Sequence, residues 1–351
     1  MRWSSAVGAA LVLGTAGACR EGGQPVPETR IALRVDSSEA IAVLSVLTEE
    51  RAGHAADSAA WAAVFESTPY RRLEAREAAM GRSFTRDTFA AFVRSDSLRA
   101  RAEALRTTLS AWSRVDFDQA ARRVLAYLPS DATIRATIFP MIKPQPNSFV
   151  FDPRNDPAIF LYLDPAVTPA KFLNTVAHEL YHIGYASVGE TGPAPGESLT
   201  PEARRAIEWM GALGEGYAML AAAGSPDVHP HAASDSADRA RWDRDLDRVD
   251  DGLAEVEAFL LDLAEGRIAT EEDERRRAFG FFGIQGPWYT VGYRMAVAIE
   301  REFGRPALIE AMSDPRVAVR RFNEAVAAEN ARTGATRRMW SAELLEAIGA
   351  T

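Results

Sequence analysis

The pentapeptide His-Glu-Leu-Tyr-His at positions 178–182 constrains this chain more than any other feature of its sequence. Side chains four residues apart project from the same face of an α-helix, one turn above each other. His178 and His182 can therefore bind one metal ion together if the segment is helical, with Glu179 beside the ion. Because the chain has only five histidines in 351 residues, chance is a poor explanation for the pattern. We expect a helix that presents both imidazoles on its polar face.

The residues before the pentapeptide predict strands and then a helix start. Apolar and polar residues alternate over 134–138, which is typical of a half-buried strand, and shorter β-type segments follow at 148–151 and 159–163. Thr168-Pro169 then combines an N-cap residue with a first-turn proline. The predicted helix has an apolar face of Phe172, Val176, Leu180 and Ile183, and an opposite face of Asn174, His178, His182 and Tyr185.

A third metal ligand is expected on a second helix, predicted over 200–223. Glu215 lies in this helix, far enough from His182 to allow a loop and an antiparallel return. It stands between two glycines, which weaken a helix, so we expect a close approach to the metal helix there. Glu215 is the predicted third ligand, and the alternatives are Glu208, His229 and His231.

Two tyrosines further along the chain are candidates for a catalytic role. Tyr289 and Tyr293 lie four residues apart in a helix expected to run to Phe303, so they share a face. A phenol near the metal could donate a hydrogen bond to a developing oxyanion. Aromatic residues on one helical face also suit a packed core, which is the alternative interpretation for both.

The N-terminus predicts export. Arg2 precedes a short apolar run and a series of small residues that ends at Cys19, the only cysteine, and this pattern resembles the lipobox of bacterial lipoproteins. Ala16 stands where that motif usually has leucine, and a plain secretory signal is the alternative. We therefore expect a signal peptide over 1–19, a flexible tether over 20–30 and an exported, lipid-anchored protein of the cell envelope. With a single cysteine, intramolecular disulfides and thiolate zinc sites in the mature chain are excluded.

The rest of the chain divides by its patterns. Residues 31–128 are predicted to form a helical N-terminal region, with one long helix over 97–127, and residues 129–351 a catalytic region. A second long amphipathic helix is predicted over 246–263. The net charge of −9, without a basic patch, argues against nucleic acid as a partner.

Three motifs in this order resemble an uncharacterised family of zinc-dependent peptidases of the gluzincin type. They are the pentapeptide at 178–182, the segment 215–218, and Tyr289 to Tyr293 leading to 303–305 and 314–316. The resemblance covers about 31–327. It implies an α+β, predominantly helical fold with a small β-sheet, and one zinc ion bound by His178, His182 and Glu215. It also implies Glu179 as catalytic base and Tyr289, with Tyr293 second, as the donor in the transition state. One turn after Glu215, where some gluzincins have an acid, this chain has Met219.

The predicted function is hydrolysis of peptide bonds by a zinc-activated water. An extended peptide could pair with the strand at 159–163 if that strand lies at a sheet edge. The competing interpretation is a non-catalytic surface lipoprotein that binds zinc or a partner, in which His229 or His231 would complete a closed site. Glu179 argues against it, because a structural site has no use for that carboxylate. A zinc hydrolase that acts on another bond is the third possibility.

Overall fold

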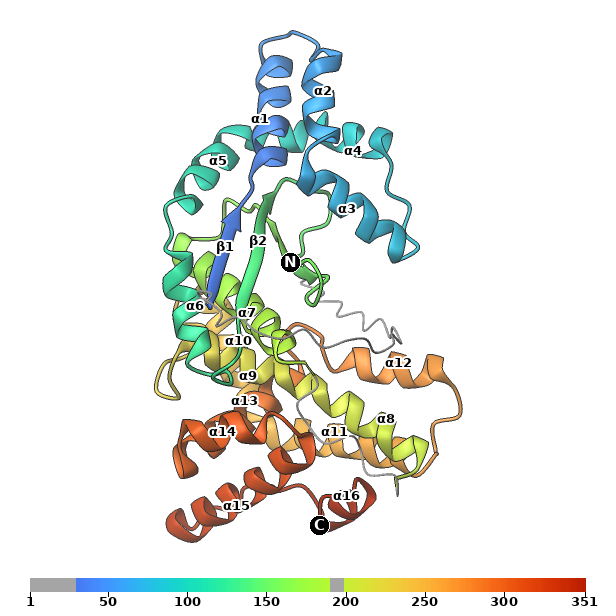
Figure 1. Cartoon of the computed structure of the whole chain (residues 1–351), viewed down its shortest axis with the longest axis vertical. Helices are drawn as coiled ribbons and strands as arrows, with labels where there is room; N and C mark the ends of the chain where they lie inside the picture. Colours follow the sequence, from blue (N-terminus) through green and yellow to red (C-terminus); the bar gives the residue numbers. More distant parts are fainter. Residues whose placement is uncertain (1–29, 190–198) are drawn as a thin grey trace, which may run out of the picture.

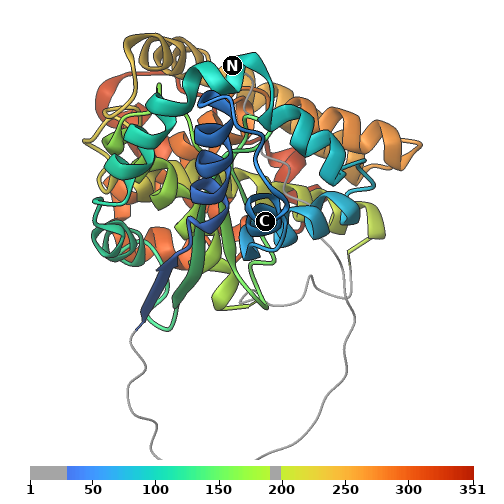
Figure 2. The ribbon, with the colours of Figure 1, turned by 90° about the horizontal axis from the view of Figure 1, so that it is seen from above.

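A four-stranded mixed sheet forms the centre of the computed structural model, which describes residues 30–189 and 199–351. Its strands are β1 (Ile31–Val35), β2 (Ile134–Met141), β3 (Phe149–Phe151) and β4 (Ala158–Tyr162), in the order β1-β2-β4-β3. The first three in this order are parallel, and β3 pairs antiparallel with β4. Figure 2 shows β1 at the outer edge of the sheet. The strand at 159–163 is therefore interior, so the condition for pairing a peptide with it is not met, and β3 holds the edge beside it.

Six helices separate β1 from β2; in Figure 1 α1, α2 and α4 lie above the sheet, and α3 lies beside its upper part. Their bounds are α1 (Ser38–Arg51), α2 (Ser58–Phe65), α3 (Thr68–Ala79), α4 (Arg86–Val93), α5 (Asp96–Trp112) and α6 (Phe117–Leu125). The single helix predicted over 97–127 is wrong, because the chain turns after Trp112 and Asp116 caps a new helix through the Gln119 N–H at 2.8 Å. The strand β1 was not predicted.

The segment with the pentapeptide forms α7 (Pro169–Ser187), as its capping residue predicts. Thr168 accepts a hydrogen bond from the Lys171 N–H at 3.2 Å. The second predicted helix is interrupted, and consists of α8 (Pro201–Met210), the 3-10 turn η1 (Gly211–Leu213) and α9 (Gly214–Ala223). Gly224 ends α9 with φ of 87°, a left-handed conformation that suits glycine.

The C-terminal helices lie below the sheet in Figure 1. They are α10 (Ser236–Asp247), α11 (Val249–Ala264), α12 (Glu271–Gly280), α13 (Pro287–Phe303), α14 (Arg305–Ala311), α15 (Pro315–Thr333) and α16 (Ala342–Ala347). The helix predicted over 246–263 is thus wrong at its start, because α10 ends before Arg248 and Leu246 belongs to α10.

One continuous core joins these helices to the α7 face of the sheet, with buried residues from Ala40 to Ala350. A smaller cluster between the sheet and α3 contains Phe139, Phe149 and Phe160. The architecture is α+β and predominantly helical, as predicted. Within the described residues, no helix is long and apolar enough to span a membrane. The predicted signal peptide and tether lie outside the described residues, apart from Arg30.

Candidate metal centre

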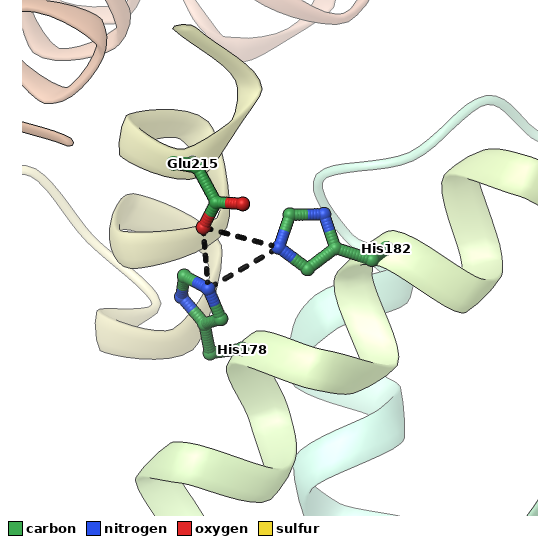
Figure 3. A group of neighbouring side chains, drawn as sticks. All are labelled: His178, His182 and Glu215. Atoms are coloured by element: carbon green, nitrogen blue, oxygen red, sulfur yellow. Dashed lines mark hydrogen bonds and ion pairs between the residues drawn. The ribbon is translucent and has the colours of Figure 1, made fainter. Parts of the chain in front are cut away.

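The two faces of α7 are those that the sequence predicts. Phe172, Val176, Leu180 and Ile183 are all at most 1% exposed and pack into the core. On the other face, the side chains of His178 and His182 are 14% and 26% exposed. Burial of the apolar face fixes the rotation of α7, so both imidazoles point toward α9 (Figure 3).

Glu215 reaches the imidazoles from the first turn of α9 and is only 4% exposed. The glycine after it allows α13 to cross very closely, since a Cβ on Gly216 would lie 1.9 Å from the Tyr293 backbone nitrogen. Gly292 on α13 similarly faces the Leu213 carbonyl, where a Cβ would be 2.1 Å away. The close approach predicted from this glycine is therefore to α13 and not to the metal helix. Gly214 has no such neighbour, so its presence has no explanation in packing.

The three side chains form a small triangle of ligand atoms (Figure 3). Glu215 Oε2 lies 3.0 Å from His178 Nε2 and 3.4 Å from His182 Nε2. The two Nε2 atoms are 3.2 Å apart. Ligands about 2.0–2.1 Å from a tetrahedral zinc ion are roughly 3.3 Å from one another, so this spacing fits zinc. No other group of three potential metal ligands occurs within 30–189 and 199–351.

The charges of this group are strongly coupled. Burial opposes ionisation of Glu215, but His182 and His178 hold the pKa of its carboxyl well below the usual range. Burial would lower the pKa of His182, but Glu215 raises it above its ordinary value. Glu215 is thus an anion facing two imidazoles, which is the donor set of a site with an open fourth position.

Comparison with known protein families agrees with this geometry. A family model described as "Putative zinc dependent peptidase (DUF5700)" matches residues 58–331. The chain belongs to this family. No curated protein and no solved structure matches the chain. The matched residues include all three members of the triangle, Glu179 and both candidate tyrosines.

In this DUF5700 chain, Glu179 is buried next to the two histidines but is not part of the triangle. Burial raises the pKa of the Glu179 carboxyl, and His178 and His182 partly oppose this effect. A carboxyl whose pKa lies nearer neutrality can both accept and return a proton.

The two candidate tyrosines have different surroundings. The ring of Tyr289 lies 6.1 Å from that of His178, nearly parallel to it at 19°. The ring of Tyr293 packs edge-on against Trp242 on α10 at 5.4 Å. Burial raises the pKa of Tyr293 to about 12. Of the pair, Tyr289 is therefore the one that contacts a residue of the triangle.

The alternative ligands lie outside the triangle. Glu208 is exposed on α8. His229 Nε2 lies 2.8 Å from Asp243 Oδ1, and His231 is buried with Nδ1 3.0 Å from Ser234 Oγ. Neither histidine therefore joins the triangle as a third or fourth ligand in this structure.

Gln285 is a residue near the site to which sequence reasoning assigned no role. Its amide nitrogen lies 3.9 Å from Met219 Sδ, one turn beyond Glu215 on α9. Its φ of 60° is one of two positive values at non-glycine residues in the described chain. The surrounding Gly283-Ile-Gln-Gly286 sequence indicates a tight turn, but it does not show where the glutamine side chain points.

Proposed function

We propose that this protein is a zinc-dependent metallopeptidase in which His178, His182 and Glu215 bind one zinc ion. The observation that carries the proposal is the triangle of two Nε2 atoms and one carboxylate oxygen with separations of 3.0, 3.2 and 3.4 Å. The family description supports the metal and the class of substrate.

Glu179 is the proposed general base. Zinc bound at this site would lower the pKa of a water molecule and polarise the scissile carbonyl. Glu179 follows His178 directly in α7, and its raised pKa suits a carboxylate that removes a proton from that water. The same carboxyl then returns the proton to the nitrogen of the departing amine. Tyr289 is the proposed donor to the oxyanion, since its ring lies against His178.

The edge strand β3 is the proposed docking element for an extended peptide. It pairs with β4 through one side only, at the end of the sheet order. An added strand would satisfy its own backbone groups by pairing with the other side of β3. The α7 helix packs against β3, so a peptide there would run beside the metal helix. The strand β3 therefore replaces the interior strand β4 as the candidate docking strand.

We also propose that the protein acts after export, held to a membrane by lipid on Cys19. The support is the N-terminal sequence alone, with its single basic residue, short apolar run and small residues before that cysteine.

Zinc analysis combined with peptide cleavage tests the function. Purified wild type should contain about one zinc ion and cleave members of a peptide library, whereas His178→Ala and Glu215→Ala should lose the metal. Glu179→Gln should keep zinc and lose cleavage, because an amide cannot accept the proton.

Four results would contradict parts of this account. A Glu179→Gln protein that cleaves peptides at the wild-type rate would remove Glu179 as base. Full zinc content in Glu215→Ala would move the third ligand elsewhere. A wild type that binds zinc but cleaves neither peptides nor small esters would favour the non-catalytic binding protein, and cleavage of esters alone would favour another class of zinc hydrolase.

A further inference from the structure

The outer nitrogen of His178 lacks the partner that a metal-binding imidazole normally has. Nε2 faces Glu215, and the opposite ring nitrogen, Nδ1, is buried without a hydrogen-bond partner. A histidine ligand almost always donates this second N–H to an oxygen, which fixes its tautomer and orientation. A buried N–H without an acceptor costs about 1–3 kcal/mol. The side chain one turn beyond Glu215, on the same face of α9, is the thioether Met219, a weak acceptor.

Gln285 brings a strong acceptor into this region. Its Nε2 atom lies 3.9 Å from Met219 Sδ, and its carbonyl Oε1 is buried without a partner. Gln285 comes four residues before Tyr289, and the ring of Tyr289 lies nearly parallel to that of His178. Gln285 thus contacts the residue one turn beyond Glu215 and comes just before α13, the helix that carries Tyr289.

The backbone at Gln285 is held in an unfavourable conformation. Its φ of 60° is in the left-handed region, which costs a residue with a side chain roughly 1 kcal/mol or more. The next residue, Gly286, has no room for a Cβ, which would be 2.6 Å from the Phe281 carbonyl oxygen. The turn around Gln285 is therefore tight enough to exclude a side chain at position 286.

His231 is a neighbour of the Gln285 side chain. It is 7% exposed, and its Nε2 is buried without a partner of good geometry. Burial lowers the pKa of His231 to about 4, and its contact with Gln285 partly opposes this shift, so the imidazole is neutral near pH 7. The loop that carries it is tied to the metal helix, since Asn174 Nδ2, one turn before His178, donates to the Pro230 carbonyl at 3.2 Å.

We propose that Gln285 is the positioning residue for the zinc ligand His178, accepting its Nδ1–H through Oε1, directly or through one water molecule. His231 holds the Gln285 side chain in place. This inference rests on the proposed zinc site. Three buried polar atoms without partners of good geometry, from His178, Gln285 and His231, would then satisfy one another. A water placed among them would have three partners, the usual number for a buried water.

Zinc affinity of the purified protein, measured by competition with a chromogenic chelator, tests the proposal. Gln285→Leu replaces the glutamine by a side chain of similar volume that must adopt the same φ of 60°, but it removes the acceptor. Its zinc dissociation constant should rise about 10- to 100-fold. The visible spectrum of the cobalt-substituted protein should also change, because an imidazole with a free outer nitrogen can rotate. Gln285→Glu keeps an acceptor for the same N–H. Its zinc dissociation constant should therefore lie within about threefold of the wild-type value or below it.

A compensating variant separates positioning from packing. Met219→Asp in the Gln285→Leu background places a carboxylate one turn beyond Glu215 and should restore tight binding. Gln119→Leu, an exposed glutamine on α6, is the matched control and should leave the affinity unchanged. The melting temperature of each metal-free variant shows whether it is folded.

The outcomes distinguish this inference from the proposed function. Wild-type affinity and an unchanged cobalt spectrum in folded Gln285→Leu would overturn the positioning role while leaving the zinc site intact. Failure of both Gln285→Glu and the Met219→Asp double variant to bind zinc tightly would also overturn it. Absence of zinc binding by the wild type itself would instead overturn the proposed function.

Discussion

The two tyrosines on α13 show how far residue type and spacing determine a role. Tyr289 and Tyr293 share a helical face by spacing, and both are buried, at 6% exposed each. Tyr289 lies at the first turn of α13 against His178, whereas Tyr293 lies one turn further on against Trp242. One turn of a helix advances about 5.4 Å, which is enough to separate a residue at the metal site from one in the core.

Replacing each tyrosine by phenylalanine tests this difference. Tyr289→Phe should lower kcat about 100-fold or more while zinc content stays at the wild-type value, because only the oxyanion donor is lost. Tyr293→Phe is the matched control, and should change kcat by less than about threefold by the same criterion. The measurements are steady-state kinetics and zinc analysis of both variants. A larger loss of kcat in Tyr293→Phe than in Tyr289→Phe would reverse the assignment.

At this scale the sequence predicts the ligands better than their surroundings. The spacing of His178 and His182 depends on one helix, and a local pattern determines it. Placing Glu215 needs only that the chain folds back onto α7, and α9 does pack against that helix. The contact between Gln285 and Met219 depends instead on how the turn before α13 meets α9, and no periodicity in the sequence contains that information.

The crossing of α9 and α13 is the packing contact on which the metal centre depends. Two glycines allow it, since Gly216 faces the backbone of α13 and Gly292 faces the Leu213 carbonyl. Glu215 is the neighbour of Gly216, so any shift of α9 away from α13 also moves the carboxylate ligand. The sequence predicts a special role for this glycine, but not which helix comes close.

Alanine substitutions at the two glycines that flank Glu215 should have opposite effects on stability. In Gly216→Ala the new Cβ would lie 1.9 Å from a backbone nitrogen, so the helices must separate at a cost of at least about 1–3 kcal/mol. In Gly214→Ala nothing lies within 4 Å of the new Cβ, and the higher helix propensity of alanine should stabilise by about 0.5–1 kcal/mol. Urea unfolding of both proteins measures the difference, and zinc affinity should fall only in Gly216→Ala. Equal stability of the two variants would contradict the crossing.

Helix boundaries follow the sequence where a capping residue marks them. Thr168 and Thr200 begin α7 and α8 as predicted, because each caps the N–H three residues later. The breaks after Trp112 and at Arg248 were missed, since apolar spacing continues across both and the turn residues there are not glycine or proline. The strand β1 was missed because its partner, β2, follows only after six helices.

The whole molecule is joined by packing between the N-terminal helices and the metal helix. Trp112 at the end of α5 stacks on Phe172 of α7, with ring centroids 3.8 Å apart and planes at 11°. Its indole nitrogen donates to the Val167 carbonyl at 3.3 Å, just before the cap of α7. A core that runs from α1 to the C-terminal residues encloses this contact. Packing is therefore continuous in space across residue 128, where the pattern of the sequence changes.

Continuous packing predicts that the described part of the chain unfolds in one cooperative transition. Calorimetry should give a single peak, and saturating zinc should raise the temperature of that whole peak, because the ligand binds only the folded state. Trp112→Ala should lower the same peak, since loss of a buried tryptophan costs about 3–5 kcal/mol. Two peaks, with Trp112→Ala moving one and zinc the other, would show instead that the regions before and after residue 128 are separate folding units. Trp112 lies in α5 and the metal ligands lie in α7 and α9, so a common shift of one peak is the result expected if the helices from both regions share one core.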